Sequence, residues 1–150
     1  MMRKFYTFSS LFFVLFLTSC MDCYYIENDL HGIWQVVSVE KCATGEKTEA
    51  KGLLYYSFQR SMVMLSQKVA NSSRRYITHF DLVAPDSIAM GDFRIRTTGE
   101  GNYVNDETKV PIDSLLKFGF YQDYTKFHLE RSTQKMVFTS DSARIVLRKY

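Results

Sequence analysis

The sequence has few reactive side chains, and it contains none of the short motifs that mark common enzyme classes. It has three histidines and three cysteines in 150 residues. It lacks a Gly-x-Ser-x-Gly nucleophile turn, a His-Glu-x-x-His zinc motif and a phosphate-binding glycine loop. We therefore expect no enzymatic activity and no cofactor.

The histidines also lack the close ligand spacing of a metal site. Two histidine–acid pairs stand two residues apart, and each pair would share one face of a strand: His79 with Asp81 and His128 with Glu130. Charged and polar residues on a strand mostly face solvent. We therefore predict no metal site.

The apolar run at the N-terminus is too short to cross a membrane as a helix. Arg3 and Lys4 precede about thirteen mostly apolar residues, 5–17, whereas a spanning helix needs roughly 20. Small residues then lead to Cys20. This arrangement is typical of a secretion signal, and it predicts that residues 1–19 are removed from the working protein.

Leu17-Thr18-Ser19-Cys20 resembles the bacterial lipobox, in which a branched residue and two small residues precede a cysteine that becomes the acylated N-terminus. The match implies that acyl chains such as palmitate on Cys20 attach the protein to a membrane of the cell envelope. The expected place is the periplasmic or surface face of the outer membrane. Each buried methylene of an acyl chain contributes about 0.8 kcal/mol to membrane binding. The alternative is an ordinary signal peptide that contains a cysteine, or an uncleaved anchor.

The charge balance excludes a strongly basic binding surface. Removing residues 1–19 takes away two basic residues and no acid, so the formal charge falls from +3 to +1. Nucleic-acid binding then lacks its electrostatic basis, and we expect no nucleic-acid partner. The remaining 131 residues suffice for one domain. We expect a tether over residues 20–29 and a single domain over residues 30–150.

If Cys20 is acylated, Cys23 and Cys42 are the only cysteines left to pair. Export permits a disulfide. Closing this loop would stabilise the fold by roughly 3 kcal/mol if the two Cα atoms come within about 7 Å. Two unpaired thiols are the alternative, and the sequence leaves both open.

Short apolar and alternating segments predict eight β-strands after the tether. The expected strands are 33–39, 53–58, 62–66, 75–82, 87–96, 126–131, 135–139 and 144–149. In the first strand, Trp34, Val36 and Ser38 share one face. Gly91 interrupts the fifth strand and predicts a bulge or bend of the kind that curves a barrel wall. The short polar connections favour antiparallel neighbours, and the fold class is all-β.

One short helix is expected over residues 112–118. Pro111 precedes it, Asp113 or Ser114 is placed to cap its first turn, and Gly119 is suited to its C-terminal stop. A helix of about two turns is marginal alone. Its apolar side must therefore pack against the sheet, at one mouth of the barrel.

Two features of these strands resemble the lipocalin-like lipoproteins of Bacteroidetes, distant relatives of the calycin superfamily. They are Gly32-x-Trp34 in the first strand and a closing three-stranded meander with apolar pairs at period two. The resemblance covers residues 30–150 and implies an eight-stranded antiparallel up-and-down barrel with one short helix. In lipocalins an arginine on the last strand lies across the tryptophan. Arg148 matches that arginine best, with Arg144 second, so the resemblance implies a barrel-closing set of Gly32, Trp34 and Arg148. Such stacking contributes about 0.5–2 kcal/mol.

The chain after residue 19 keeps seven phenylalanines, nine tyrosines and one tryptophan, and several methionines fall in expected strands. Methionine adapts to irregular shapes, so an interior lined by it could accept a small apolar ligand. An eight-stranded barrel either packs solid or holds one small molecule. The candidate lining residues are Tyr56, Phe58, Met62, Met64, Phe80, Met90, Phe127, Leu129, Met136 and Phe138. We expect either a binder of a small hydrophobic ligand or a filled barrel that meets a protein partner through its loops at 41–52 and 98–111.

Three Asp-Ser-aliphatic sequences resemble the acceptor for O-glycosylation in exported Bacteroidetes proteins. They make three serines candidate glycosylation sites: Ser87, Ser114 and Ser142. Asp-Ser pairs also favour turns and helix caps, and each of the three stands where a turn or cap is expected. The turn or cap role is the simpler interpretation.

Overall fold

The computed structural model describes residues 29–69, 75–99 and 102–150, with the side chains of 97–99 and 102–107 excepted. The predicted signal, Cys20 and Cys23 lie outside the described residues. The chain divides into two units, and the second, His31–Tyr150, holds the strands found in the described residues. Within the described ranges, none of the helices has the length and apolar character needed to cross a membrane.

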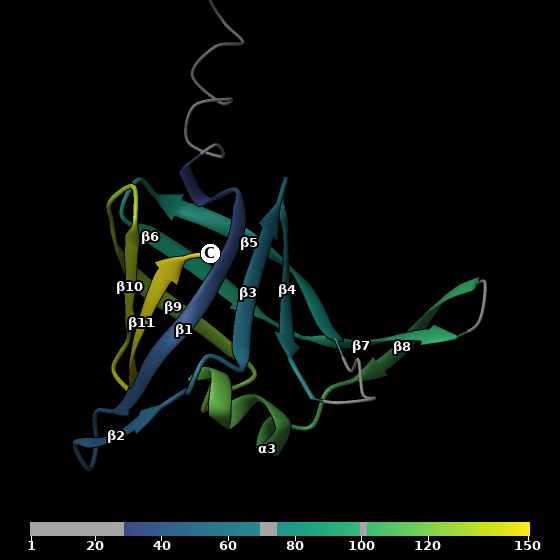
Figure 1. The fold of residues 1–150 in the computed structure, drawn as a ribbon, viewed down its shortest axis with the longest axis horizontal. Coiled ribbons are helices and arrows are strands. Elements are labelled where there is room, and N and C mark those ends of the chain that lie inside the picture. Colours follow the sequence, from purple (N-terminus) through teal and green to yellow (C-terminus); the bar gives the residue numbers. More distant parts are fainter. Residues whose placement is uncertain (1–28, 70–74, 100–101) are drawn as a thin grey trace, which may run out of the picture. The chain divides into compact units, whose positions relative to one another are not determined.

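Strands dominate this unit, and one short helical segment interrupts them (Figure 1). The strands are β1 (Gly32–Lys41), β2 (Glu46–Glu49), β3 (Leu54–Gln59), β4 (Met62–Gln67), β5 (Arg75–Ala84), β6 (Ser87–Gly91), β7 (Arg94–Gly99), β8 (Asn102–Lys109), β9 (Tyr124–Arg131), β10 (Lys135–Thr139) and β11 (Ala143–Lys149). The helical segment is α3 (Ile112–Leu115) followed by the 3-10 turn η1 (Leu116–Phe118).

The strands close into an eight-stranded antiparallel barrel, which confirms the predicted fold class. The order around the wall is β4-β3-β1-β11-β10-β9-β6-β5, and β5 pairs again with β4 to complete the circle. Three strands lie beyond this circle. β2 pairs with the end of β1, β7 pairs with the start of β5, and β8 forms a hairpin with β7. In Figure 1 that hairpin extends away from the barrel.

β1 changes its inward face part-way along, because its pairing with β11 slips by one residue. Val36 lies opposite Leu147, and after the irregularity Val39 lies opposite Ile145. Directly opposite residues share a face of the sheet, so Val39 joins Trp34 and Val36 inside the barrel. Ser38, which the alternation places with them, turns outward instead. A β-bulge adds one residue to a strand and so shifts every later side chain to the other face.

The wall bends at Gly91, as the sequence predicts. Phe80 of β5 lies opposite Met90, whereas Ile77 lies opposite Arg94, so three steps on β5 face four on the other strand. One extra residue is therefore inserted between β6 and β7. A Cβ atom on Gly91 would lie 2.2 Å from the backbone oxygen of Asp123 and 2.6 Å from the Cα of Tyr124. Only glycine lets these two backbones approach so closely.

The end of the helical segment matches the prediction, whereas its start does not. Gly119 ends it with a left-handed φ of 91°, as expected. Neither Asp113 nor Ser114 caps its start, because Pro111 occupies the N-cap position and no side-chain cap hydrogen bond forms. Packing holds the segment instead. Leu115 and Phe118 are buried, and the segment lies at one end of the barrel (Figure 1).

We expect Gly91→Ala to lower the free energy of unfolding by about 3 kcal/mol, since the methyl group would meet backbone atoms that cannot rotate away. Gly45→Ala is the control. The space around Gly45 is open, so that variant should lose only about 1 kcal/mol for its positive φ. Urea unfolding followed by circular dichroism measures both. Equal losses in the two variants would contradict a contact at Gly91.

Candidate functional site

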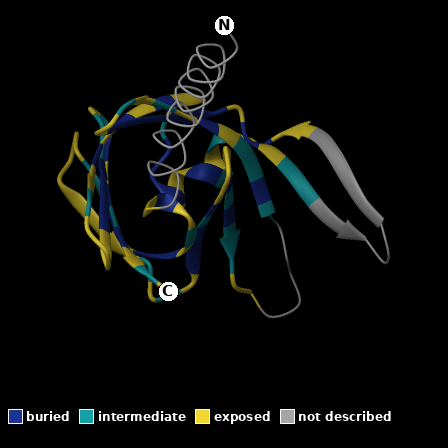
Figure 2. Ribbon diagram, turned by 90° about the horizontal axis from the view of Figure 1, so that it is seen from above, coloured by how far each residue is buried: buried dark blue, intermediate teal, exposed yellow. Residues whose placement is uncertain are grey.

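Aromatic rings fill the interior of the barrel around Tyr56. The ring of Tyr56 has its centroid 5.9–6.4 Å from those of Phe58, Phe118, Phe120 and Phe138. Further ring pairs at 5.4–5.7 Å continue the cluster across the wall. Buried residues occur around the whole wall when the barrel is seen from above (Figure 2). The rings contact one another, and this is the packing of a protein core.

The phenol group of Tyr56 is satisfied inside this cluster. Its hydroxyl donates a hydrogen bond of 2.5 Å to the backbone oxygen of Phe118 at the end of η1. Burial raises the pKa of Tyr56 well above its ordinary value. The hydroxyl therefore stays protonated at neutral pH and ties the helical segment to β3.

Eight of the ten candidate lining residues are buried, at 5% exposure or less: Tyr56, Phe58, Phe80, Met90, Phe127, Leu129, Met136 and Phe138. Met62 and Met64 lie on the outer face of β4, so neither lines the interior of the barrel as predicted. Met62 is 36% exposed, and Met64 lines an outer groove with Ile33 and Tyr150. Side chains alternate along a strand, and in β4 the inward positions belong to Val63 and Leu65, both fully buried.

The cation over the tryptophan is Lys149, and Arg148 has a different partner. Trp34 lies opposite Lys149 in the β1–β11 register, and the Lys149 ammonium lies 4.5 Å from the centre of the Trp34 ring system. Arg148 lies opposite Gln35, and its Nε donates a hydrogen bond of 2.7 Å to Gln35 Oε1. Arg148 and Lys149 are consecutive residues of β11, so their side chains lie on opposite faces of the strand.

Gly32 contributes space to the same contact. Its φ is 119°, and a Cβ atom there would lie 2.9 Å from Lys149 Nζ. That ammonium also donates a hydrogen bond of 2.5 Å to the backbone oxygen of His31. The glycine, the indole and a basic residue of the last strand therefore meet at one end of the barrel, with lysine in place of arginine.

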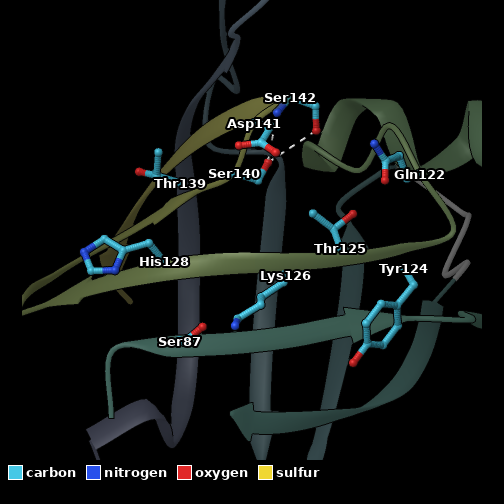
Figure 3. A pocket seen from close by; sticks show the side chains of 10 residues that line it. All are labelled: Ser87, Gln122, Tyr124, Thr125, Lys126, His128, Thr139, Ser140, Asp141 and Ser142. Carbon is cyan, nitrogen blue, oxygen red and sulfur yellow. Dashed lines mark hydrogen bonds between the residues drawn. The ribbon is translucent and has the colours of Figure 1, made fainter. Parts of the chain in front are cut away.

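A polar groove of about 570 Å³ lies on the outside of the barrel, along β9 (Figure 3). Its walls are β9, the start of β6, the segment before β9 and the turn between β10 and β11. The lining residues are Ser87, Gln122, Tyr124, Thr125, Lys126, His128, Thr139, Ser140, Asp141 and Ser142. Most of these residues are polar, but Thr125 lies opposite Met90, so its side chain shares the inward face of the wall.

The candidate glycosylation serines are only partly accessible. Ser87 is 9% exposed and its hydroxyl donates to the backbone oxygen of Phe127 at 3.5 Å. Ser114 and Ser142 are half-buried. Ser142 lies 3.3 Å from the hydroxyl of Ser140 in the β10–β11 turn, which supports the turn role for that Asp-Ser pair.

Cys42 carries a free, exposed thiol, and its Sγ lies 3.7 Å from the backbone oxygen of Ser140. Its candidate disulfide partner lies outside the described residues. Among the residues that the structure describes, no group of three or more His, Cys, Asp or Glu side chains converges on one point.

The lipocalin-like domain family matches residues 15–150 of this sequence. The chain belongs to the lipocalin-like domain family. A lipocalin-like protein from Bacteroides uniformis shares its fold, with a TM-score of 0.56 at 16% identity over 81% of this chain and 99% of that one. An uncharacterized protein from Bacteroides eggerthii gives a TM-score of 0.57 at 19% identity with the same coverage. Among curated proteins, none matches this chain.

The sequence does not indicate the outer groove of this lipocalin-like domain. Its residues come from four separate segments, and on each strand they resemble ordinary solvent-facing positions. Ser87 and Ser142 stood out only as glycosylation candidates, and His128 only as half of a histidine–acid pair. The one available signal was the hydroxyl-rich turn 139–142.

We expect Lys149→Met to lower the free energy of unfolding by about 0.5–1 kcal/mol and to shift the fluorescence emission of Trp34, because the ammonium over the indole is lost. Arg148→Met is the matched control. It should cost about 1 kcal/mol, since the buried Gln35 loses a donor, but should leave the emission unchanged. Urea unfolding and emission spectra test both variants. An emission shift in the Arg148 variant alone would contradict the assignment.

Proposed function

We propose that this lipocalin-like protein is a lipid-anchored, non-enzymatic binding protein of the cell envelope, in which the filled barrel is a scaffold and recognition takes place on its outside. The ring cluster around Tyr56 carries this proposal. Rings at centroid distances of 4.8–6.4 Å occupy the place where a lipocalin would hold a ligand. A ligand inside would have to displace groups that already contact one another.

The anchor follows from the lipobox at Cys20, with the outer membrane as the expected location. A tether from Cys20 to His31 has eleven steps and spans at most about 40 Å when extended. The barrel could therefore reach a partner close to the membrane surface. The segments 41–52 and 98–111, expected as loops that meet a protein partner, contain β2 and β8, and both of these strands lie outside the barrel circle. All four residues of β2 are exposed.

A small apolar ligand inside the barrel is the second candidate function. The specific observation in its favour is that Met90 and Met136 are fully buried among the interior rings. Methionine side chains can rearrange around a ligand more easily than rings or branched side chains can. This function would need the interior to open on binding.

Titration with hydrophobic probes separates the two functions. We expect no saturable change in Trp34 emission when the Cys20→Ser chain lacking residues 1–19 is titrated with a fatty acid, a hydrophobic dye or toluene. Phe138→Ala is the matched control, because it opens an apolar cavity in the cluster that can admit toluene. Saturable binding by the parent protein would overturn the filled scaffold and favour the second candidate.

Cell fractionation tests the anchor. We expect the full chain to sediment with membranes and to carry acyl chains on Cys20 by mass spectrometry, because acylated lipoproteins stay on bilayers almost permanently. Cys20→Ser should abolish the modification. Cys42→Ser is the control and should leave it unchanged, since Cys42 lies within the barrel unit. An unmodified Cys20 in the full chain would contradict the proposed anchor.

A further inference from the structure

We propose that one side of the barrel, formed by the outer faces of β1, β3 and β4, docks on an anionic phospholipid bilayer. The proposal rests on the proposed function, since the anchor at Cys20 is what brings the barrel close to a membrane, and it names the surface that meets the lipid. Three observations carry it: a cluster of exposed apolar side chains, basic groups beside them and the place where the tether joins the domain.

Exposed apolar side chains gather on this side of the barrel, where β1, β3 and β4 lie next to one another (Figure 1). Side chains alternate along a strand, so the outward positions are separate from those that fill the core. Among the described residues, nine large hydrophobic side chains are exposed, and six of them lie on these strands or directly beside them: Ile33, Val37, Leu53, Met62, Val69 and Tyr150. An exposed apolar cluster marks a place where another surface binds.

A groove of about 390 Å³ runs through this cluster and brings apolar and basic groups together. Its lining includes Ile33, Val69 and Tyr150, which are 46%, 50% and 68% exposed, and the basic residues Lys68 and Arg75. In the described part of the chain, no Asp or Glu lines this groove, and neither Lys68 nor Arg75 forms a salt bridge. The groove therefore joins apolar surface to positive charge that no acid neutralises.

Two tyrosine rings fix the position of the Lys68 ammonium. It lies 4.9 Å from the centre of the Tyr55 ring and 5.1 Å from that of Tyr150, and it donates a hydrogen bond of 3.4 Å to the Tyr150 hydroxyl. The two rings meet edge to face at 5.3 Å. Gln35 donates a hydrogen bond of 3.1 Å to the Tyr55 hydroxyl, which ties the arrangement to β1. Lys68 nevertheless remains exposed, so its charge can meet a lipid phosphate.

Two further basic residues share this outer face. Arg148 of β11 lies opposite Gln35, and Lys135 of β10 lies opposite Arg148. On its other side Gln35 lies opposite Tyr55. Directly opposite residues share a face of the sheet, and both Arg148 and Lys135 are exposed. Anionic lipids attract such clusters, and each Lys or Arg near the surface raises membrane affinity about fivefold.

The tether joins the domain beside this patch. The barrel unit begins at His31, and Ile33 follows two residues later. The backbone N–H of Tyr150 donates a hydrogen bond of 3.0 Å to the backbone oxygen of Ile33, so the C-terminal residue lies at the same place. The eleven steps from Cys20 to His31 span at most about 40 Å. A short tether keeps the patch at high effective concentration near the bilayer, so even weak contacts with lipid hold it there.

A second copy of the chain is the other occupant that an exposed apolar face suggests. In a two-fold dimer the same patch of both copies would meet itself. The basic groups around the groove would then face the same groups of the partner copy, and like charges across an interface are costly. An anionic bilayer offers the opposite charge. The charge of the patch thus favours lipid over a second copy.

The test uses the Cys20→Ser chain lacking residues 1–19, so that acyl chains contribute nothing to binding. This chain keeps the whole barrel, because the closed wall and its core lie within His31–Tyr150. Sedimentation with large vesicles measures binding. The vesicles contain phosphatidylcholine alone, or phosphatidylcholine with one third phosphatidylglycerol. We expect binding to the anionic vesicles to be at least about tenfold tighter than to the neutral ones and to weaken as sodium chloride is added.

Substitutions of one basic and one apolar residue locate the contact. Lys68→Gln and Val69→Ser should each weaken binding to anionic vesicles about fivefold, through the loss of a charge and of apolar contact area. Lys126→Gln is the matched charge control, because β9 lies across the barrel from β3. Val83→Ser is the matched apolar control, since Val83 is 54% exposed at the opposite end of β5 from Arg75. Both controls should leave binding unchanged, and circular dichroism checks that all four variants are folded.

Three vesicle results would overturn the proposal: no binding to anionic vesicles, equal binding to neutral ones, or controls that weaken binding as much as the patch variants. Self-association of the lipid-free chain that Val69→Ser abolishes would also overturn it, and would assign the face to a second copy. None of these results bears on the acylation of Cys20, which is measured on the full chain. An unmodified Cys20 would instead refute the anchor, whereas vesicle binding by the Cys20→Ser chain does not depend on that modification.

Discussion

The pairing of β1 with β11 joins the two ends of the domain, and the rest of the barrel depends on it. β1 lies between β3, which belongs to the first part of the domain, and β11, the last strand. Without β11, one edge of the sheet would expose unpaired backbone groups and the interior rings would meet water. The contact of Trp34 with Lys149 and the hydrogen bond between Gln35 and Arg148 lie on opposite faces of this one pairing.

A barrel of eight strands has an interior that side chains can fill, and here aromatic rings occupy it. The Tyr56 hydroxyl extends the cluster to the helical segment, so the mouth and the core are stabilised together. A filled barrel is rigid, and rigidity is useful to a protein that presents a binding surface on its outside. The family therefore fixes the scaffold, whereas function depends on the side chains that a particular sequence places on it.

The bend at Gly91 connects the scaffold to the polar outer groove along β9. Its missing side chain admits the backbone of 123–124, which places Tyr124 at the end of β6, at the start of the segment that β10 leaves unpaired. The same insertion turns β7 out of the barrel circle, where it can pair with β8. One extra residue thus shapes both the outer groove and the outer hairpin.

The sequence by itself determined the eight strands of the barrel wall, the closing meander, the bend at Gly91 and the helix stop at Gly119, because alternation and glycine geometry are local properties of the chain. It did not predict β2 or β8, which lie in segments expected to be loops and lack an alternating apolar pattern. Only the tertiary structure decided that Val39 faces inward in place of Ser38, and that Lys149 rather than Arg148 lies over Trp34. Both depend on register, and a slip of one residue exchanges the two faces of a strand. The polar groove along β9 likewise exists only where four distant segments meet, so no local pattern could predict it.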